Sequence, residues 1–191
     1  MFINKKMGEI HLKIVYYGPS LSGKTTNLQY IHSHVNPKVR GDLISLKTSE
    51  DRTIYFDFLQ IELDKILGLK PKFSLYTVPG QPYYEASRRL VLNGADGVVF
   101  VADARRYRMV ENLDNLKSLS KYLRQMGAES KRFPFVLQVN KQDLPDIWTP
   151  DQLAMQLGTN GAPCFGSVAT RGDGVFETLK AVINAVIQRI Q

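Results

Sequence analysis

The chain has 191 residues, 43% of them hydrophobic and 23% charged, which is ordinary for a soluble globular protein with a buried core. No apolar run approaches the ~18 residues that a membrane-spanning helix needs, and the polar first nine residues do not read as a signal peptide. The formal net charge of +7 is scattered and comes without a nucleic-acid-binding motif, so we expect no nucleic-acid partner.

The single cysteine, Cys164, allows no internal disulfide and fits a reducing cytosol. Neither chain end carries a prenylation or myristoylation signal, so we expect a cytoplasmic protein without a lipid anchor. The basic surface is either simply solvated or makes peripheral contacts with a partner or a membrane surface. No linker, repeat or low-complexity segment divides the sequence, which predicts one domain across residues 1–191.

Apolar periodicity predicts strands and helices that alternate along the chain. The predicted strands are residues 10–17, 54–59, 73–78, 97–102, 135–139 and 164–169, and the predicted helices are 24–34, 83–93, 110–123, a short helix from 150, and 175–190. The closely joined strands 54–59 and 73–78 predict an antiparallel pair. The whole pattern predicts an α/β fold, a doubly wound, mostly parallel six-stranded sheet with one antiparallel edge strand and helices on both faces.

Residues 18–25 read GPSLSGKT and fit the phosphate-binding motif G-x-x-x-x-G-K-S/T between the first strand and the first helix. A helix N-terminus carries unpaired amides and a partial positive charge, so these amides would converge on phosphate oxygens. Lys24 would reach the β- and γ-phosphates, and the Thr25 hydroxyl would bind Mg²⁺. The residues expected to bind nucleotide here are Gly18, Ser20, Leu21, Ser22, Gly23, Lys24, Thr25 and Thr26. The alternative is a glycine-rich turn with an ordinary surface lysine.

Residues 140–143, Asn-Lys-Gln-Asp, directly follow a buried strand and therefore lie at the ligand edge of the predicted sheet. The Asp143 carboxylate can accept two hydrogen bonds from guanine, whereas adenine lacks that pair of donors. A buried carboxylate left unpaired is costly, so this residue would select guanine. The stem of Lys141 can lie against the base, and Asn140 can tie this loop to the phosphate loop. The alternative is a loop of capping residues.

Across nearly its full length the chain resembles a Ras-like small GTPase, and more closely the bacterial MglA group of polarity and gliding-motility GTPases. The resemblance is carried by residues 13–19, 21–28, 52–53, 56–59, 75–81, 101–103 and 174–180. The stretch Thr77-Val78-Pro79-Gly80-Gln81 is the most specific of these, because most Ras-like proteins carry Asp where this chain has Thr77. The resemblance implies a protein that binds GTP, GDP and Mg²⁺.

The resemblance also implies catalytic roles. Gln81 corresponds to the glutamine that orients the attacking water, and Arg52 to an arginine supplied in cis that neutralises charge in the transition state. Thr53 corresponds to the switch I threonine, which would bind Mg²⁺ beside Thr25. With Lys24, these residues would supply the positioning and charge stabilisation that phosphoryl transfer requires. A surface ion pair is the alternative role for Arg52.

Three further positions are implied to bind nucleotide. The Gly80 amide would sense the γ-phosphate. Val168 and Ala169 correspond to the last guanine-binding loop, with the Ala169 amide near the base oxygen. Segments of about 41–53 and 79–88 would act as switches that are ordered by the γ-phosphate and released after hydrolysis.

Two residues depart from the Ras-like pattern. Thr77 replaces the aspartate that usually holds Mg²⁺ through water, so either the metal is bound less tightly or another oxygen serves. Ser20 stands where related chains usually have glycine, close to the place where the glutamine and the arginine must fit. Even a small side chain at that position would slow hydrolysis.

These expectations favour a switch that hydrolyses GTP slowly, that is stimulated by a roadblock-fold activating protein of the MglB type, and that acts on polarity or motility effectors. Such a protein would work in the cytoplasm and be recruited to the cell poles or the inner membrane surface. A GTP-binding scaffold with little turnover is the second hypothesis. A phosphate-loop ATPase or small-molecule kinase is the third, and Asp143 argues against it.

Overall fold

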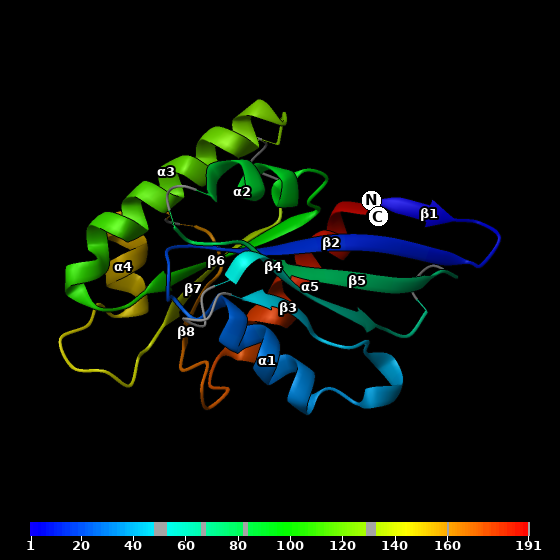
Figure 1. The fold of residues 1–191 in the computed structure, drawn as a ribbon, viewed down its shortest axis with the longest axis horizontal. Coiled ribbons are helices and arrows are strands. Elements are labelled where there is room, and N and C mark those ends of the chain that lie inside the picture. The colour runs from blue at the N-terminus through cyan, green and yellow to red at the C-terminus, as the bar shows by residue number, and fades with distance from the viewer. Residues whose placement is uncertain (48–52, 66–67, 82–83, 129–132, 160, 191) are drawn as a thin grey trace.

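The computed structural model describes residues 1–47, 53–65, 68–81, 84–128, 133–159 and 161–190, with only the backbone described for residues 46–47 and 53–55. The chain forms a mixed α/β fold in which one sheet lies between two layers of helices (Figure 1). The fold class that the sequence predicts is therefore confirmed.

Within the described residues, eight strands form the sheet. They are β1 (Phe2–Asn4), β2 (Glu9–Tyr17), β3 (Ile44–Lys47), β4 (Thr53–Glu62), β5 (Lys70–Thr77), β6 (Gly97–Asp103), β7 (Phe135–Asn140) and β8 (Cys164–Ser167). Their order is β3-β4-β5-β2-β6-β7-β8, with β1 paired to β2 outside this path. The strands from β5 to β8 in this order are parallel, so β2, β6 and β7 end at one edge of the sheet, where ligands bind in such folds.

The predicted number of six strands is wrong, because the described part of the chain adds β1 and β3. β3 lies outside β4, so β4 is antiparallel to β5 as predicted but is not the edge strand. The added strands have only three and four residues, which is too short for an apolar alternation to stand out. They are strands because they pair with β2 and β4, and this tertiary pairing outweighs local propensity.

Five α-helices and two short 3₁₀ helices lie within the described ranges. They are α1 (Lys24–His34), η1 (Pro37–Val39), α2 (Glu85–Leu92), η3 (Arg106–Arg108), α3 (Met109–Gln125), α4 (Pro150–Leu157) and α5 (Val175–Ile190). α1 and α5 pack on one face of the sheet, and α2, α3 and α4 bury residues on the other. The predicted cap of α4 is confirmed, because the Thr149 hydroxyl accepts a hydrogen bond from the Gln152 amide.

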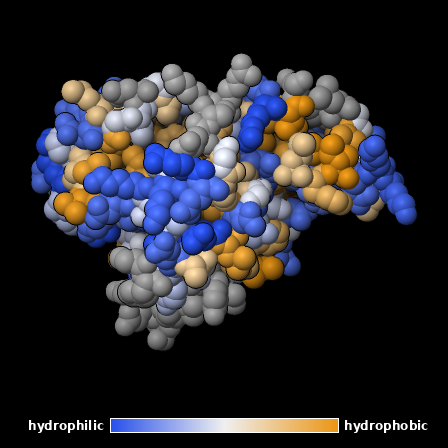
Figure 2. Space-filling model, turned by 90° about the horizontal axis from the view of Figure 1, so that it is seen from above, coloured by the Kyte–Doolittle hydropathy of each residue, from blue (hydrophilic) through white to orange (hydrophobic). Residues whose placement is uncertain are grey.

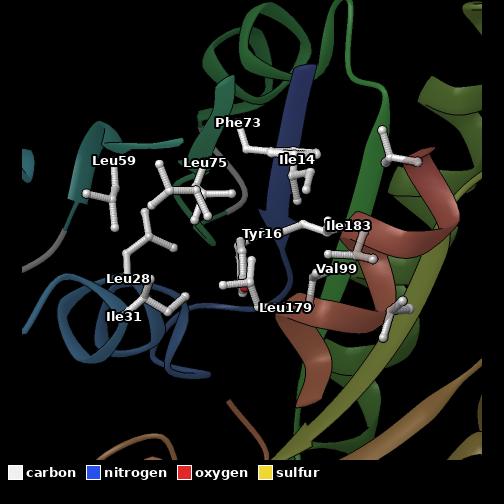
Figure 3. Close-up of a cluster of buried hydrophobic side chains, with 14 of the residues drawn as sticks. Ile14, Tyr16, Leu28, Ile31, Leu59, Phe73, Leu75, Val99, Leu179 and Ile183 are labelled. Atoms are coloured by element: carbon white, nitrogen blue, oxygen red, sulfur yellow. The ribbon is translucent and has the colours of Figure 1, made fainter. Parts of the chain in front are cut away.

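The apolar layer under α1 and α5 fixes the two elements that flank the phosphate-binding motif (Figure 3). Ile14 and Tyr16 of β2 belong to this layer, together with Leu28 of α1 and Leu179 of α5, and each is less than 5% exposed. Burying an apolar side chain of this size stabilises the fold by about 1.5–3 kcal/mol. Because β2 and α1 are both held here, the loop between them has fixed ends.

The outer surface mixes hydrophilic and apolar side chains (Figure 2). Met1, Phe2 and Met7 near β1 and Leu90 on α2 are each more than 60% exposed. None of the helices in the described ranges has the length and apolar character that crossing a membrane requires.

Candidate functional site

The loop between β2 and α1 is held by two glycines that leave no room for a side chain. Gly18 has a φ of +147°, and a Cβ there would lie 2.2 Å from the Val101 carbonyl oxygen. Gly23 has a φ of +104°, and a Cβ there would lie 2.1 Å from Asn140 Nδ2. Leu21, between them, also has a positive φ of 60° and is 64% exposed. The loop is therefore pressed against the ends of β6 and β7 in a conformation that demands glycine at both positions.

Lys24 begins α1, and its side chain is buried inside this loop. The ammonium donates hydrogen bonds to the carbonyl oxygens of Gly18 at 3.0 Å and Pro19 at 2.7 Å. Burial lowers the pKa of Lys24 to about 7, while nearby Asp57 raises it and the surrounding cations lower it further. A concentration of positive charge at a helix N-terminus attracts a polyanion such as a triphosphate.

The Thr25 hydroxyl contacts the carboxylate of Asp57, a residue that was not predicted to belong to the site. Thr25 Oγ1 donates to Oδ2 of Asp57 at 2.5 Å, and Thr77 Oγ1 donates to the same oxygen at 2.7 Å. The Ser45 hydroxyl donates to Oδ1 of Asp57, which is fully buried. Hydroxyl and carboxylate oxygens are the ligands that Mg²⁺ prefers in proteins, so Thr25 and Asp57 fit a magnesium site.

Asp57 lies opposite Thr77 across two antiparallel strands, one residue beyond the Phe58–Tyr76 pair. The replacement of aspartate by Thr77 predicts that another oxygen could serve, and Asp57 is a residue that the sequence did not identify for this. The available signal was one acidic residue inside the otherwise apolar and aromatic segment 54–59. Its partner could not be found from sequence, because strand register is fixed only when the sheet forms.

Asn140, at the end of β7, joins three loops. Its Nδ2 donates to the Ser22 carbonyl oxygen at 2.8 Å, and its Oδ1 accepts from the Ala169 amide at 2.9 Å and from the Ser167 hydroxyl at 3.1 Å. Asn140, Val168 and Ala169 are all less than 5% exposed. The Ala169 amide, expected near a base oxygen, thus has Asn140 as its acceptor. The side chain of Asn140 brings the phosphate loop next to the two loops expected to bind the base.

Lys141 and Asp143 follow in the same loop. Lys141 Nζ donates to Oδ2 of Asp103 at 2.8 Å, and Arg105 Nη2 reaches the same oxygen at 2.6 Å. Burial alone would raise the pKa of Asp103, but the hydrogen bonds from Arg105 and Lys141 hold it below its ordinary value. Asp143 is exposed in the loop beyond. This contact of Asp103 was not predicted, although the place of Asp103 at the end of a buried strand puts it at the ligand edge.

The start of the second switch lies against the phosphate loop. A Cβ on Gly80 would lie 2.2 Å from the Ser20 amide nitrogen, so these two backbones touch. Arg88 Nη1 donates to the Gln81 carbonyl oxygen at 2.7 Å, and Arg108 Nη2 donates to the Ser20 carbonyl oxygen at 2.9 Å. The predicted catalytic glutamine is therefore brought to the loop that holds Lys24.

The remaining predicted residues are placed less fully. Thr26 is half-buried in the first turn of α1. Thr53 is the first residue of β4 and pairs with Lys47, and its side chain lies outside the described part of the chain. Arg52 lies outside the described residues.

Comparisons with known proteins agree with this geometry. Residues 1–186 match the ADP-ribosylation factor family. The chain is 48% identical over 190 residues to the mutual gliding-motility protein MglA of Myxococcus xanthus (strain DK1622), covering 100% of this chain and 97% of that protein. It is 26% identical over 186 residues to the Ras-related protein Rab-32C of Dictyostelium discoideum, covering 95% and 76%. It is 24% identical over 192 residues to the ADP-ribosylation factor-like protein 2 of Arabidopsis thaliana, covering 97% and 92%.

The family match spans nearly the whole chain, and the similarity to MglA spans both proteins almost end to end. The chain therefore belongs to the Arf/Ras-like small GTPases, which bind guanine nucleotides, and among them to the MglA group.

Proposed function

We propose that this protein is a guanine-nucleotide switch that binds GTP or GDP with Mg²⁺ and hydrolyses GTP to GDP and phosphate. The observation that carries the proposal is the Asn140 junction, whose side chain joins the phosphate loop at Ser22 to the loop at Ala169. One nucleotide can then span the distance from Lys24 to Asp143. In this proposal residues 1–191 form a single guanine-nucleotide-binding domain.

Base selection rests on Asp143. Its carboxylate accepts two hydrogen bonds from guanine, and a bound adenine would leave it without them. Lys141, which lies beside it, is held by the Asp103 carboxylate at 2.8 Å, so its stem has a defined direction along which the base can stack. This arrangement favours a GTPase over a phosphate-loop ATPase or kinase.

The metal would be held by Thr25 and Asp57, with Thr53 as the ligand that joins when the γ-phosphate is present. When bound, Mg²⁺ neutralises phosphate charge and orients the oxygens that surround the reacting phosphorus. Asp57 supplies from β4 the carboxylate that Thr77 does not supply from β5. The fit is supported by the hydrogen bond of 2.5 Å that already joins the Thr25 hydroxyl to Asp57.

Hydrolysis would depend on positioning and on charge. Gln81 orients the attacking water, Lys24 and Arg52 neutralise the charge that develops on the phosphate oxygens, and the Gly80 amide responds to the γ-phosphate. The contact between Gly80 and Ser20 leaves little space beside the phosphate loop, which supports slow turnover in the protein alone.

The biological role proposed here follows from the similarity to MglA, whose name refers to gliding motility. The protein would act in the cytoplasm, control polarity or motility effectors, and be recruited to the cell poles or the inner membrane surface. An activating protein of the MglB type, with a roadblock fold, would accelerate hydrolysis.

A GTP-binding scaffold with little turnover is the second candidate. It is favoured by the close approach of Gly80 to the Ser20 backbone, because the side chain of Ser20 adds further bulk where Gln81 and Arg52 must meet. The two functions share the same binding site and differ only in the rate of the chemical step.

The test is to purify the protein, identify the nucleotide that copurifies, and follow GDP formation from added GTP with and without an MglB-type protein. We expect guanine nucleotide, poor competition by ATP, and slow turnover that the activator raises. Gln81→Leu serves as the control with impaired chemistry. Binding of ATP as readily as GTP would contradict the proposal, and tight GTP binding with no turnover even with the activator would establish the scaffold.

A further inference from the structure

Two neighbouring arginines on α2 have opposite surroundings. Arg88 is only 6% exposed, whereas Arg89 is exposed to solvent. A buried guanidinium is costly unless it is hydrogen-bonded, so Arg88 must have partners that offset its burial. One of them is the backbone of the loop that precedes α2, because Arg88 Nη1 donates to the Gln81 carbonyl oxygen at 2.7 Å.

The other contacts of Arg88 come from elements on both sides of α2. On α3, burial and Glu85 raise the pKa of Tyr122 whereas Arg88 lowers it, so the Arg88 guanidinium lies near this hydroxyl. Tyr17, at the carboxyl end of β2, is fully buried. Burial raises the pKa of its hydroxyl, and the charge of nearby Arg88 lowers it. The guanidinium therefore lies near Tyr17 of β2 and Tyr122 of α3, both in the buried apolar core, and from there it reaches the Gln81 backbone.

This contact matters because the neighbouring residue is already fixed. Gly80 lies so close to the phosphate loop that a Cβ would come within 2.2 Å of the Ser20 amide nitrogen. With Gly80 held in this way, the direction of the Gln81 side chain depends on rotation of the backbone between these two residues. A hydrogen bond to the Gln81 carbonyl oxygen restrains that rotation, and Arg88 donates such a bond.

We propose that Arg88 is a positioning residue for GTP hydrolysis, which holds the backbone of Gln81 so that the glutamine side chain faces the attacking water. This inference rests on the proposed function. In this role Arg88 acts through Gln81 and is not itself a ligand of the nucleotide. Loss of the contact therefore slows the chemical step and leaves nucleotide binding nearly unchanged.

The experiment measures single-turnover hydrolysis of preloaded GTP, together with the dissociation rate of a fluorescent GDP analogue, for the parent, Arg88→Ala, Arg88→Lys and Arg89→Ala. Misplacing a catalytic group by a fraction of an ångström to an ångström costs roughly ten- to a hundredfold in rate, and we expect Arg88→Ala to lose that much. Arg88→Lys keeps the charge and a donor and should recover part of the rate. Arg89→Ala, one residue along the same helix, should hydrolyse GTP at the parent rate.

A second measurement separates positioning from general destabilisation. If Arg88 acts through Gln81, then Arg88→Ala added to Gln81→Leu causes no further loss of rate, because the side chain that it positions is already gone. Parental GDP dissociation rates in Arg88→Ala and Arg88→Lys show that the nucleotide site is still folded.

Three outcomes overturn the inference. The first is an Arg88→Ala protein that hydrolyses GTP at the parent rate. The second is a full additional loss in the double variant, and the third is a loss of hydrolysis matched by an equal loss of GDP binding in both Arg88 variants. In each of these three outcomes the parent still hydrolyses GTP, so the proposed function stands. A parent protein that binds GTP but does not hydrolyse it overturns the proposed function and this inference together.

Discussion

Thr77 and Asp57 face each other across β5 and β4, and the Thr77 hydroxyl donates a hydrogen bond of 2.7 Å to Oδ2 of Asp57. The same oxygen accepts from the Thr25 hydroxyl, the residue that the phosphate-binding motif assigns to Mg²⁺. β4 therefore presents a carboxylate at the same level of the sheet as Thr77 on β5, beside the Thr25 hydroxyl. Thr77, which stands where most Ras-like proteins carry aspartate, thus donates its hydroxyl hydrogen bond to the acid that we propose as the metal ligand.

The first prediction tests this exchange. Asp57→Asn should weaken Mg²⁺ binding by about 10–100-fold, because an amide carries no negative charge toward the metal. The measurement is the release rate of a fluorescent GDP analogue as a function of Mg²⁺ concentration, with Asp64→Asn, an exposed acid just after β4, as the control. In the double variant Asp57→Asn/Thr77→Asp the carboxylate returns to β5, and Mg²⁺ dependence should return in part. An Asp57→Asn protein with the Mg²⁺ response of the parent would contradict the assignment.

The second prediction concerns Ser20. Ser20→Gly should raise the single-turnover rate of GTP hydrolysis by about tenfold, because it removes bulk at the point where the Gly80 backbone touches the phosphate loop. Ser20→Ala keeps the Cβ and should behave like the parent, which separates a steric effect from an effect of the hydroxyl. Equal rates for Ser20→Gly and the parent would show that the serine does not limit turnover.

The third prediction concerns Asp103, the fully buried acid that accepts hydrogen bonds from Lys141 and Arg105. Asp103→Asn should lower the free energy of unfolding at pH 7 by about 2 kcal/mol, because it leaves charge-assisted hydrogen bonds without their ionic acceptor. Asp173→Asn, in the exposed pair with Arg171, should cost less than about 1 kcal/mol.

The loss in Asp103→Asn should depend on pH in a defined direction. The pKa of Asp103 is held below its ordinary value in the folded protein, so its contribution is complete above the unfolded value of about 4 and is lost as the pH falls through the folded pKa. The difference in unfolding free energy between the parent and Asp103→Asn should therefore shrink in acid, which denaturant titrations at several pH values can measure. A difference that grows below about pH 4 would show that another group controls this region.

The sequence was sufficient for the parts of the site that are local in the chain. The phosphate-binding motif places Lys24 and Thr25 at a helix start, and the buried strand before Asn140 places that residue at the ligand edge. Both follow from elements whose periodicity is long and clear. Asn140 could also be expected to tie two loops, because its residue type and its place after a strand suffice for that inference.

The rest depends on pairing between distant segments. Asp57 and Thr77 are 20 residues apart and meet only because β4 and β5 pair in one register. β3 exists only through its pairing with β4, so neither it nor the internal position of β4 could be predicted. The contact of Arg88 with Gln81 likewise needs a helix that buries one of two adjacent arginines, which the sequence does not distinguish.

The last prediction tests base selection. Asp143→Asn replaces a carboxylate that accepts two hydrogen bonds with an amide that can also donate. Guanine presents two donors to this position, whereas xanthine presents a carbonyl oxygen in place of the exocyclic amine. Asp143→Asn should therefore lose GTP affinity by a hundredfold or more, on the order seen when a site built to hydrogen-bond its substrate loses that match, and should gain affinity for XTP. Competition of each nucleotide against a fluorescent guanine analogue measures both changes.

Asp146→Asn, which changes an exposed acid three residues further along the same loop, is the matched control and should keep the preference for GTP. If Asp143→Asn still prefers GTP over XTP as the parent does, then the base is recognised elsewhere, and the span from Lys24 to Asp143 does not describe the bound nucleotide.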